Sequence, residues 1–387
     1  CFLLMAQLIN YDDIRPYSND ELQSVLQSLL SQQEFIRLVD NYFPAVNIKS
    51  LASRIGDFND IDTFQRVVIA PVLEIFLRNV TSDISCSGIE NYNSPAILMS
   101  NHRDIVMDPA ILAFVMLKHF SITPEIAMGD NLLATKWIED FVRLNKSIIV
   151  KRSIPAFQKA KAFMQLSSYI RYAVTQKHSS VWIAQREGRA KDSNDRTQES
   201  LVKMLALSGD KSFIDNVKEL NITPLTISYE FDPCDYLKAK ELYERKRNPQ
   251  YIKAPGEDVF SMQTGIMGFK GRVHYAFSPS INSDLDDIAS AFPSKKEQAV
   301  AVCELCDKRI HSAYKFFPIN RYAYKLITRD NRFDGIDSGE ELLNAEKYVE
   351  GQLSKIKSDN ADFGELRDIL LRMYANPLIN NIAATEK

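Results

Sequence analysis

The chain has 387 residues, of which 45% are hydrophobic and 25% are charged, as in an ordinary globular protein. Its formal net charge is only −3, so it has no overall attraction to nucleic acid or to an anionic membrane, and any cationic site must be local. No uncharged apolar run reaches the roughly 18 residues that a membrane-spanning helix requires.

Five cysteines are scattered along the chain, at Cys1, Cys86, Cys234, Cys303 and Cys306. An odd number without a regular framework indicates a reducing compartment, so we expect a cytoplasmic protein. Cys303 and Cys306 form a single Cys-x-x-Cys inside a helical pattern. We expect this to be a buried or incidental pair and not a metal site.

The first part of the chain, residues 1–83, is expected to form a helical N-terminal region. Residues 5–20 are polar and are interpreted as an extended arm that ends at a helix start near Ser18. A second helix is predicted over 61–80, where Pro71 should bend or interrupt it. We expect its apolar stripe to pack on the neighbouring domain; the alternative is that it lies on a membrane surface.

Between residues 84 and 283, short apolar runs alternate with helical stretches, which predicts an α/β domain with a mostly parallel central sheet flanked by helices. The polar stretch 233–270 is interpreted as an irregular insertion with one charged helix, 238–247. The predicted strands are 96–100, 125–128, 146–151, 180–184, 222–229 and 271–277, and the predicted helices are 109–118, 132–142, 155–176 and 196–207. Residues 284–387 are expected to form a helical C-terminal region, with helices at 284–291, 294–316, 318–327, 339–357 and 363–375.

One histidine lies in the loop between the strand 96–100 and the following helix. His102 precedes two carboxylates, Asp104 and Asp108, and Asp108-Pro109 is a good helix start because Asp caps free N–H groups. Imidazole moves protons near neutral pH, and a carboxylate on its Nδ1 would fix its tautomer. Either aspartate could take this role. The alternative is a histidine satisfied by backbone, with Asp108 serving only as a cap.

Cations follow the ends of two later strands. If the strands are parallel, these cations would gather with His102 at one edge of the sheet. Several arginines beside a histidine–carboxylate pair suit a phosphate-bearing substrate, because guanidinium binds phosphate through two hydrogen bonds. Taken singly, each cation would be a solvated surface charge. The group comprises Lys151, Arg152, Arg186, Arg189 and Lys191, with Glu187 and Gly188 between the last arginines.

Four ordered blocks resemble the glycerophospholipid acyltransferases, which include the glycerol-3-phosphate and 1-acylglycerol-3-phosphate acyltransferases. The family pattern is Asn-His, four residues and Asp, then a strand ending in Arg, then Glu-Gly-Thr-Arg, then an apolar strand led by Pro. The resemblance covers residues 96–230. Its blocks are Asn101-His102 with Asp108, then Arg152, then Glu187-Gly188-Arg189, and finally Pro224.

Two departures from the pattern indicate a divergent branch. Five residues separate His102 from Asp108, so either the loop bulges by one residue or Asp104 takes the role. We favour Asp108, because Asp-Pro at the head of the helix resembles related loops. In addition, no residue stands between the Gly and the Arg of the third block, so Arg189 is expected to be displaced, with Arg186 or Lys191 sharing its work.

The resemblance implies direct acyl transfer without a metal or a resident cofactor. His102 would act as general base on a hydroxyl of glycerol-3-phosphate or 1-acylglycerol-3-phosphate, with an aspartate orienting it, and the thioester of acyl-CoA or of an acyl-carrier protein would be the donor. The expected partners also include a membrane surface, bound peripherally, and no nucleic acid. The expected substrate-binding residues are Asn101, Arg103, Lys151, Arg152, Arg186, Glu187, Gly188, Arg189 and Lys191.

Two alternatives remain open at this point. The acceptor could be a lyso-amino lipid, whose carboxylate also suits arginines, or the protein could be a non-catalytic lipid- or carrier-binding module. A serine hydrolase is disfavoured because the chain lacks Gly-x-Ser-x-Gly, and nucleotide hydrolysis because it lacks a phosphate-binding Gly-Lys-Ser/Thr loop.

Overall fold

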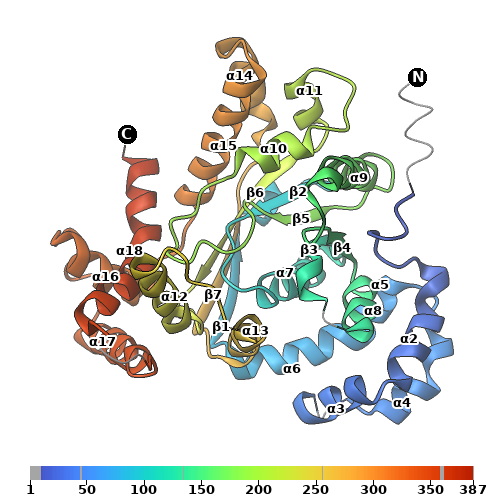
Figure 1. Cartoon of the computed structure of the whole chain (residues 1–387), viewed down its shortest axis with the longest axis horizontal. Helices are drawn as coiled ribbons and strands as arrows, with labels where there is room; N and C mark the ends of the chain where they lie inside the picture. Colours follow the sequence, from blue (N-terminus) through green and yellow to red (C-terminus); the bar gives the residue numbers. More distant parts are fainter. Residues whose placement is uncertain (1–9, 44–45, 134, 255, 358–360, 387) are drawn as a thin grey trace.

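The computed structural model describes residues 10–43, 46–133, 135–254, 256–357 and 361–386 (Figure 1). Its centre is a seven-stranded sheet with the order β1-β7-β6-β2-β5-β3-β4. Neighbouring strands are parallel except for the antiparallel pair β6 and β7. The predicted α/β class with a mostly parallel sheet is therefore confirmed. The strands are β1 (Asp83–Ser87), β2 (Ile97–Ser100), β3 (Glu125–Gly129), β4 (Ser147–Val150), β5 (Val181–Ala184), β6 (Ile222–Tyr229) and β7 (Arg272–Phe277).

Helices cover both faces of the sheet, because successive side chains of its strands point to opposite sides. In β2, Ile97 and Met99 enter one apolar core while Leu98 enters the other, and all three are fully buried. The first core is closed by α9 (Ala156–Thr175), α10 (Glu199–Leu205), α11 (Phe213–Lys218), α14 (Leu285–Ala291) and α15 (Lys295–Ser312). The second core is closed by α6 (Ala70–Val80) and α7 (Met107–Phe120).

Two further helical groups lie at opposite sides of the sheet (Figure 1). Each has an apolar cluster of its own. The N-terminal group packs on α8 (Lys136–Leu144) and contains α2 (Leu22–Ser31), α3 (Gln33–Tyr42), α4 (Ile48–Ser53) and α5 (Ile61–Phe64). The C-terminal group contains α12 (Asp235–Arg247), α16 (Pro318–Thr328), α17 (Gly339–Leu353) and α18 (Phe363–Thr385). Among the described residues, no helix has the length and apolarity needed to cross a bilayer.

The structure corrects several predicted elements. The predicted helix 61–80 is not interrupted at Pro71, because a π-helical turn, Gln65–Ile69, joins α5 to α6 just before the proline. Such a turn leaves room for a residue that has no N–H to donate. The strand β1 was not predicted, since its sequence Asp-Ile-Ser-Cys-Ser lacks an apolar alternation. Helix α18 continues through Pro377 to Thr385, beyond its predicted end.

The stretch 233–270 is also more regular than predicted. It contains α12 and a second helix, α13 (Glu257–Met267), and the interpretation of the rest of this stretch as irregular was wrong for α13. The pattern was misleading because three large apolar residues of α13, Val259, Phe260 and Met267, are about half exposed, while Ile266 packs on the sheet core. Cys303 and Cys306, as predicted, are buried thiols on α15.

A buried carboxyl group ties α12 to the C-terminal helices. Asp235 accepts hydrogen bonds from the hydroxyl of Tyr374 (2.6 Å) and from the amide of Gln352. Burial raises the pKa of Asp235 to about 7, and repulsion from Asp232 adds to the effect. The folded protein therefore holds a proton at Asp235 at pH values where the unfolded chain releases it.

This proton gives a pH-dependent term in stability. Between about pH 4 and pH 7 the folded state binds one proton more than the unfolded state at this site, so the free energy of unfolding falls as pH rises. Each unit of pKa difference corresponds to about 1.4 kcal/mol. We expect urea unfolding of Asp235→Asn to show a smaller loss of stability between pH 5 and pH 7 than the wild type. Identical slopes for the two proteins would contradict the assignment.

Candidate active site

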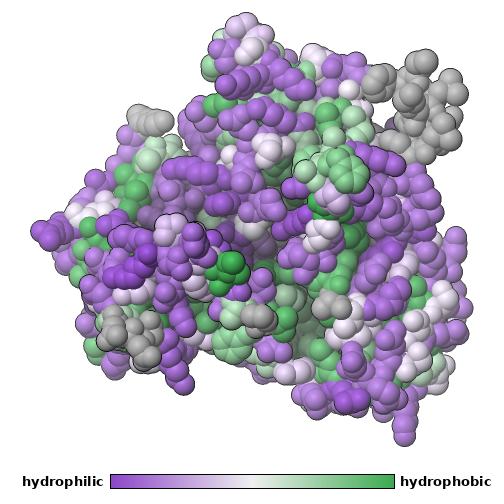
Figure 2. Space-filling model, in the orientation of Figure 1, coloured by the Kyte–Doolittle hydropathy of each residue, from purple (hydrophilic) through white to green (hydrophobic). Residues whose placement is uncertain are grey.

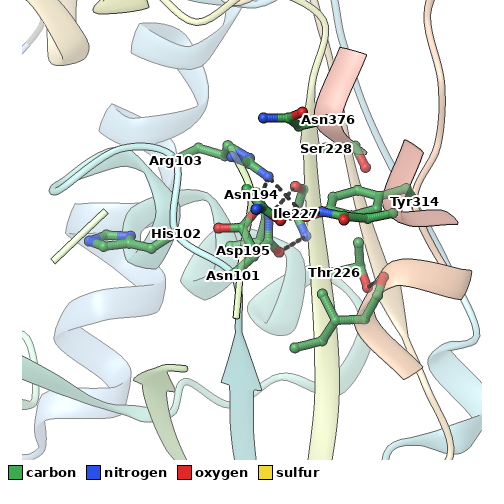
Figure 3. Close-up of polar contacts among 12 residues, drawn as sticks. Asn101, His102, Arg103, Asn194, Asp195, Thr226, Ile227, Ser228, Tyr314 and Asn376 are labelled. Carbon is green, nitrogen blue, oxygen red and sulfur yellow. Dashed lines mark hydrogen bonds and ion pairs between the residues drawn. The ribbon is translucent and has the colours of Figure 1, made fainter. Parts of the chain in front are cut away.

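The histidine loop leaves the sheet at the carboxyl end of β2, between β6 and β5. Asn101, the first residue of the loop, is fully buried. Its amide nitrogen donates to the carbonyl of Ile227 in β6 (2.9 Å), and its amide oxygen accepts from the N–H of the same residue (2.8 Å; Figure 3). Asn101 was expected to bind substrate, but both of its polar side-chain atoms are occupied by β6. It anchors the loop to the sheet.

His102 and Asp108 form a hydrogen-bonded pair, with 2.7 Å between Nδ1 and Oδ2. The same carboxylate oxygen accepts the N–H groups of Arg103 (2.6 Å) and Asp104 (3.0 Å). Burial of Asp108 acts to raise its pKa, but the hydrogen bond and charge of His102 and the two N–H groups outweigh it, so the pKa is lowered. The loop curls around this carboxylate, and the five-residue spacing still brings the pair together.

Asp104, the alternative partner, has a different position. Its Oδ1 accepts the N–H groups of Val106 (3.0 Å) and Met107 (2.8 Å), so it caps the start of α7. Burial and the neighbouring Asp108 raise the pKa of Asp104. The expectation that Asp108 caps this helix was wrong, because α7 begins at Met107, two residues before the predicted start at residue 109, and Asp104 accepts the N–H groups at this end of the helix.

The imidazole of His102 packs on the indole of Trp182 in β5, with ring centroids 5.6 Å apart and an angle of 67° between the ring planes. The indole N–H of Trp182 donates to Ser100 Oγ (2.9 Å), which fixes the ring. Since Nδ1 of His102 is taken by Asp108, Nε2 is the nitrogen that can meet a ligand in the cavity beside it. The sequence analysis did not single out Trp182, because a lone tryptophan inside an apolar strand has no distinguishing signal.

Arg103 points away from His102, to the other side of the loop (Figure 3). Its guanidinium donates to Asp195 and to the hydroxyl of Tyr314 (2.9 Å), and that hydroxyl donates to Asp195 (2.8 Å). The buried ammonium of Lys238 donates to the Arg103 carbonyl (2.9 Å). Arg103 was expected to bind substrate, but these contacts bury its side chain and hold the loop in place.

The cavity beside His102 has a volume of about 510 Å³ and two kinds of wall. One is apolar and the other is rich in cations, so the cavity can accept a molecule with both an apolar chain and an anionic group. The apolar wall comprises Ile105, Pro109, Ile126, Met128, Leu132 and Trp182, and the cationic wall comprises Arg152, Arg186, Arg189, Lys191 and Lys253, with Glu187, Gly188, Asp192 and Asp258 among them.

The strand-end cations therefore gather with His102, with one exception. Lys151 does not line the cavity, because its ammonium binds Asp13 and the side chain of Gln165 (3.1 Å). The neighbouring Arg152 does line the cavity, and its Nε lies 3.8 Å from Oε1 of Glu187. The side chains of the adjacent residues Lys151 and Arg152 point in different directions after β4. The sequence pattern could not show which of the two faces the cavity.

Within the cationic wall, Arg186 has a feature suited to an anion. Its Nε is buried without a hydrogen-bond partner among the described residues. The ammonium of Lys191, in contrast, is already bound to the carboxylate of Glu241. Burial lowers the pKa of Lys191 to about 8, and the nearby charges of Lys253, Arg245 and Arg189 contribute. An anion bound among these cations would satisfy the free N–H and reduce their mutual repulsion.

Comparison with known proteins bears on the central part of the chain. Residues 83–230 match the family model described as Acyltransferase. We call residues 83–230 the acyltransferase domain, after the family model that they match. The match contains the histidine loop and confirms the resemblance that the four sequence blocks predicted.

Other comparisons add little to the identification of the acyltransferase domain. No curated protein matches the chain. A solved structure that resembles it is the 1-acyl-sn-glycerophosphate (LPA) acyltransferase PlsC from Thermotoga maritima, with 12% identity over 74% of this chain and 95% of that one. The TM-score is 0.36.

Helix α13 contacts the histidine loop of the acyltransferase domain through Gly265. A Cβ atom at position 265 would overlap Oδ2 of Asp104, the residue that caps α7. In an exposed helix, Gly→Ala commonly stabilises by about 1 kcal/mol. Here the added methyl group must displace either α13 or the loop.

We expect Gly265→Ala to lower the free energy of unfolding by about 1–3 kcal/mol, as overpacked sites do. Gly351→Ala is the matched control, because position 351 also lies inside a helix and a Cβ there meets nothing within 4 Å. Urea unfolding of both variants checks the contact. A Gly265→Ala protein as stable as the control would show that α13 does not press on the loop.

Proposed function

We propose that the protein is a glycerophospholipid O-acyltransferase that moves a fatty acyl group from a thioester to a hydroxyl of glycerol-3-phosphate or its 1-acyl derivative. The observation that carries this proposal is the His102–Asp108 pair at the edge of a cavity with one apolar and one cationic wall. The acyltransferase domain supports the reaction class. The cationic wall suits a phosphate, and the apolar wall suits an acyl chain.

The proposed reaction uses His102 as a general base. Its Nε2 takes the proton of the acceptor hydroxyl while the oxygen attacks the thioester carbonyl, and Nδ1–H stays on Asp108. The buried Asp108 carboxylate stabilises the imidazolium that forms. The tetrahedral intermediate then collapses, the C–S bond breaks, and His102 returns the proton to the thiolate. The products are the ester and a free thiol.

The donor is proposed to be acyl-CoA or an acyl-carrier protein, used as a co-substrate. Arg152, Arg186 and Arg189 bind the phosphate of the acceptor, and Glu187 orients Arg152. A lyso-amino lipid would present a carboxylate to the same arginines, so it belongs among the acceptors to be tested. The intact hydrogen bond between His102 and Asp108 favours an enzyme over a binding module, since binding alone has no need of a buried charged partner for the imidazole.

A thiol-release assay tests the proposal. The purified protein is incubated with an acyl thioester and, in turn, glycerol-3-phosphate, its 1-acyl derivative and a lyso-amino lipid. We expect His102→Ala to lower kcat/KM by about 10²–10⁴, the usual contribution of general base catalysis. His119→Ala is the matched control, because His119 is exposed at the far end of α7.

The variants should unfold at the same temperature as the wild type, so that a loss of turnover reports chemistry. If no acceptor raises thiol release above the His102→Ala background, the proposal that the protein is an acyltransferase is refuted. Release with the lyso-amino lipid alone would keep the acyltransferase and change its acceptor.

A further inference from the structure

A buried lysine from outside the acyltransferase domain reaches the histidine loop. Lys238 lies on α12, beyond residues 83–230, and its side chain is only 4% exposed. The surface of the molecule over α12 is mainly hydrophilic (Figure 2), and the three basic residues that end this helix, 245–247, are exposed. A lysine is almost never fully buried unless its ammonium is paired. The burial of Lys238 therefore depends on the partners of its ammonium.

The ammonium of Lys238 has two partners. It forms an ion pair with the carboxylate of Asp232, and it donates a hydrogen bond to the backbone carbonyl of Arg103 (2.9 Å). Asp232 is in turn held by α18, because its N–H donates to the hydroxyl oxygen of Tyr374 (3.0 Å). The C-terminal helical group thereby places a positive charge against the backbone of the histidine loop.

One peptide group connects this lysine to the catalytic pair. The carbonyl of Arg103 and the N–H of Asp104 belong to the same planar unit. Its oxygen accepts from Lys238, and its N–H donates to Oδ2 of Asp108 (3.0 Å). The same Oδ2 accepts the hydrogen bond from Nδ1 of His102 (2.7 Å). We call the ammonium, this peptide group and the Asp108 carboxylate the lysine relay.

The two ends of the lysine relay carry opposite charges. An ammonium on the carbonyl draws electron density from the N–H of the same peptide group, so the N–H becomes a stronger donor, and hydrogen bonds in series strengthen one another in this way. The charged partners also strengthen both bonds. Burial acts to raise the pKa of Asp108, but His102 and the N–H groups of Arg103 and Asp104 outweigh it. The relay thus orients the peptide group and supports the charge that faces His102.

We propose that Lys238 is a positioning residue for the acyl transfer, and that it acts on His102 through this peptide group and Asp108. The inference rests on the proposed function, in which His102 is the general base. Lys238 does not line the cavity, so it directs the base without touching a substrate. The helical region that follows the acyltransferase domain then contributes to the chemistry as well as to the stability of the fold.

The double variant Lys238→Met with Asp232→Asn tests the proposal. It removes the ammonium without leaving an unpaired buried carboxylate, and neutral replacement of a buried ion pair is often tolerated. We expect kcat for thiol release to fall roughly tenfold or more, as for the loss of a hydrogen bond to a charged group, with KM unchanged. In TROSY NMR of deuterated protein, the amide proton of Asp104 should move upfield, because its peptide group is less polarised.

The matched control is the double variant Arg321→Met with Asp337→Asn. This ion pair belongs to the same C-terminal helical group, with side chains 16% and 5% exposed, against 4% and 12% for Lys238 and Asp232. Its hydrogen bonds stay within residues 316–337 and do not reach the histidine loop. The control should keep the kcat of the wild type and the wild-type position of the Asp104 amide resonance.

Three results would overturn the inference: an Asp104 amide proton that does not move, a wild-type kcat in the Lys238 double variant, or an equal loss of kcat in the control. If the double variant does not fold, Lys238→Gln, which keeps an N–H donor without the charge, should give a smaller upfield shift, and no shift would be decisive against the relay. The amide shift requires no turnover. A wild type without thiol release, in which the amide still responds as expected, would therefore refute the proposed function and not the relay.

Discussion

The carboxylate of Asp108 organises the site. One buried oxygen of this group accepts three hydrogen bonds, from the imidazole of His102 and from two backbone N–H groups of the same loop. The loop is therefore wound around a single negative charge. A buried charge is costly unless it is paired and hydrogen-bonded. The hydrogen bonds that keep Asp108 ionised therefore also fix the direction of the imidazole. The proposed general base depends on this arrangement.

The surrounding fold secures that loop from several sides. Asn101 binds it to β6, Asp104 caps α7, and Arg103 reaches the Asp195–Tyr314 pair. These contacts come from segments far apart in the chain, and they explain why the residues next to His102 bind protein and not ligand. The parallel strands β2, β3, β4 and β5 end at the same edge, which is why the cations that follow two of them can meet His102.

Sequence reasoning located the central strands, because each is a short buried apolar run between helices. It also predicted that His102, Arg152, Arg186 and Arg189 lie at one site, as they do in the cavity, because this prediction required only that the strands be parallel. It could not choose between adjacent residues such as Lys151 and Arg152, because their directions depend on local backbone turns. It missed α13, since hydrophobic patterning assumes that apolar residues face a core, and three of the large apolar residues of α13, Val259, Phe260 and Met267, are about half exposed.

The most direct test of the account is the tautomer of His102 in the folded protein. Nitrogen NMR of protein labelled at its five histidines, with His102 assigned by comparison with His102→Gln, reads the two ring nitrogens separately. The account predicts that neutral His102 carries its proton on Nδ1, toward Asp108, with Nε2 bare, and that Asp108→Asn abolishes this preference. A proton on Nε2 in the wild type would contradict it, because that nitrogen could not then take a proton from an acceptor.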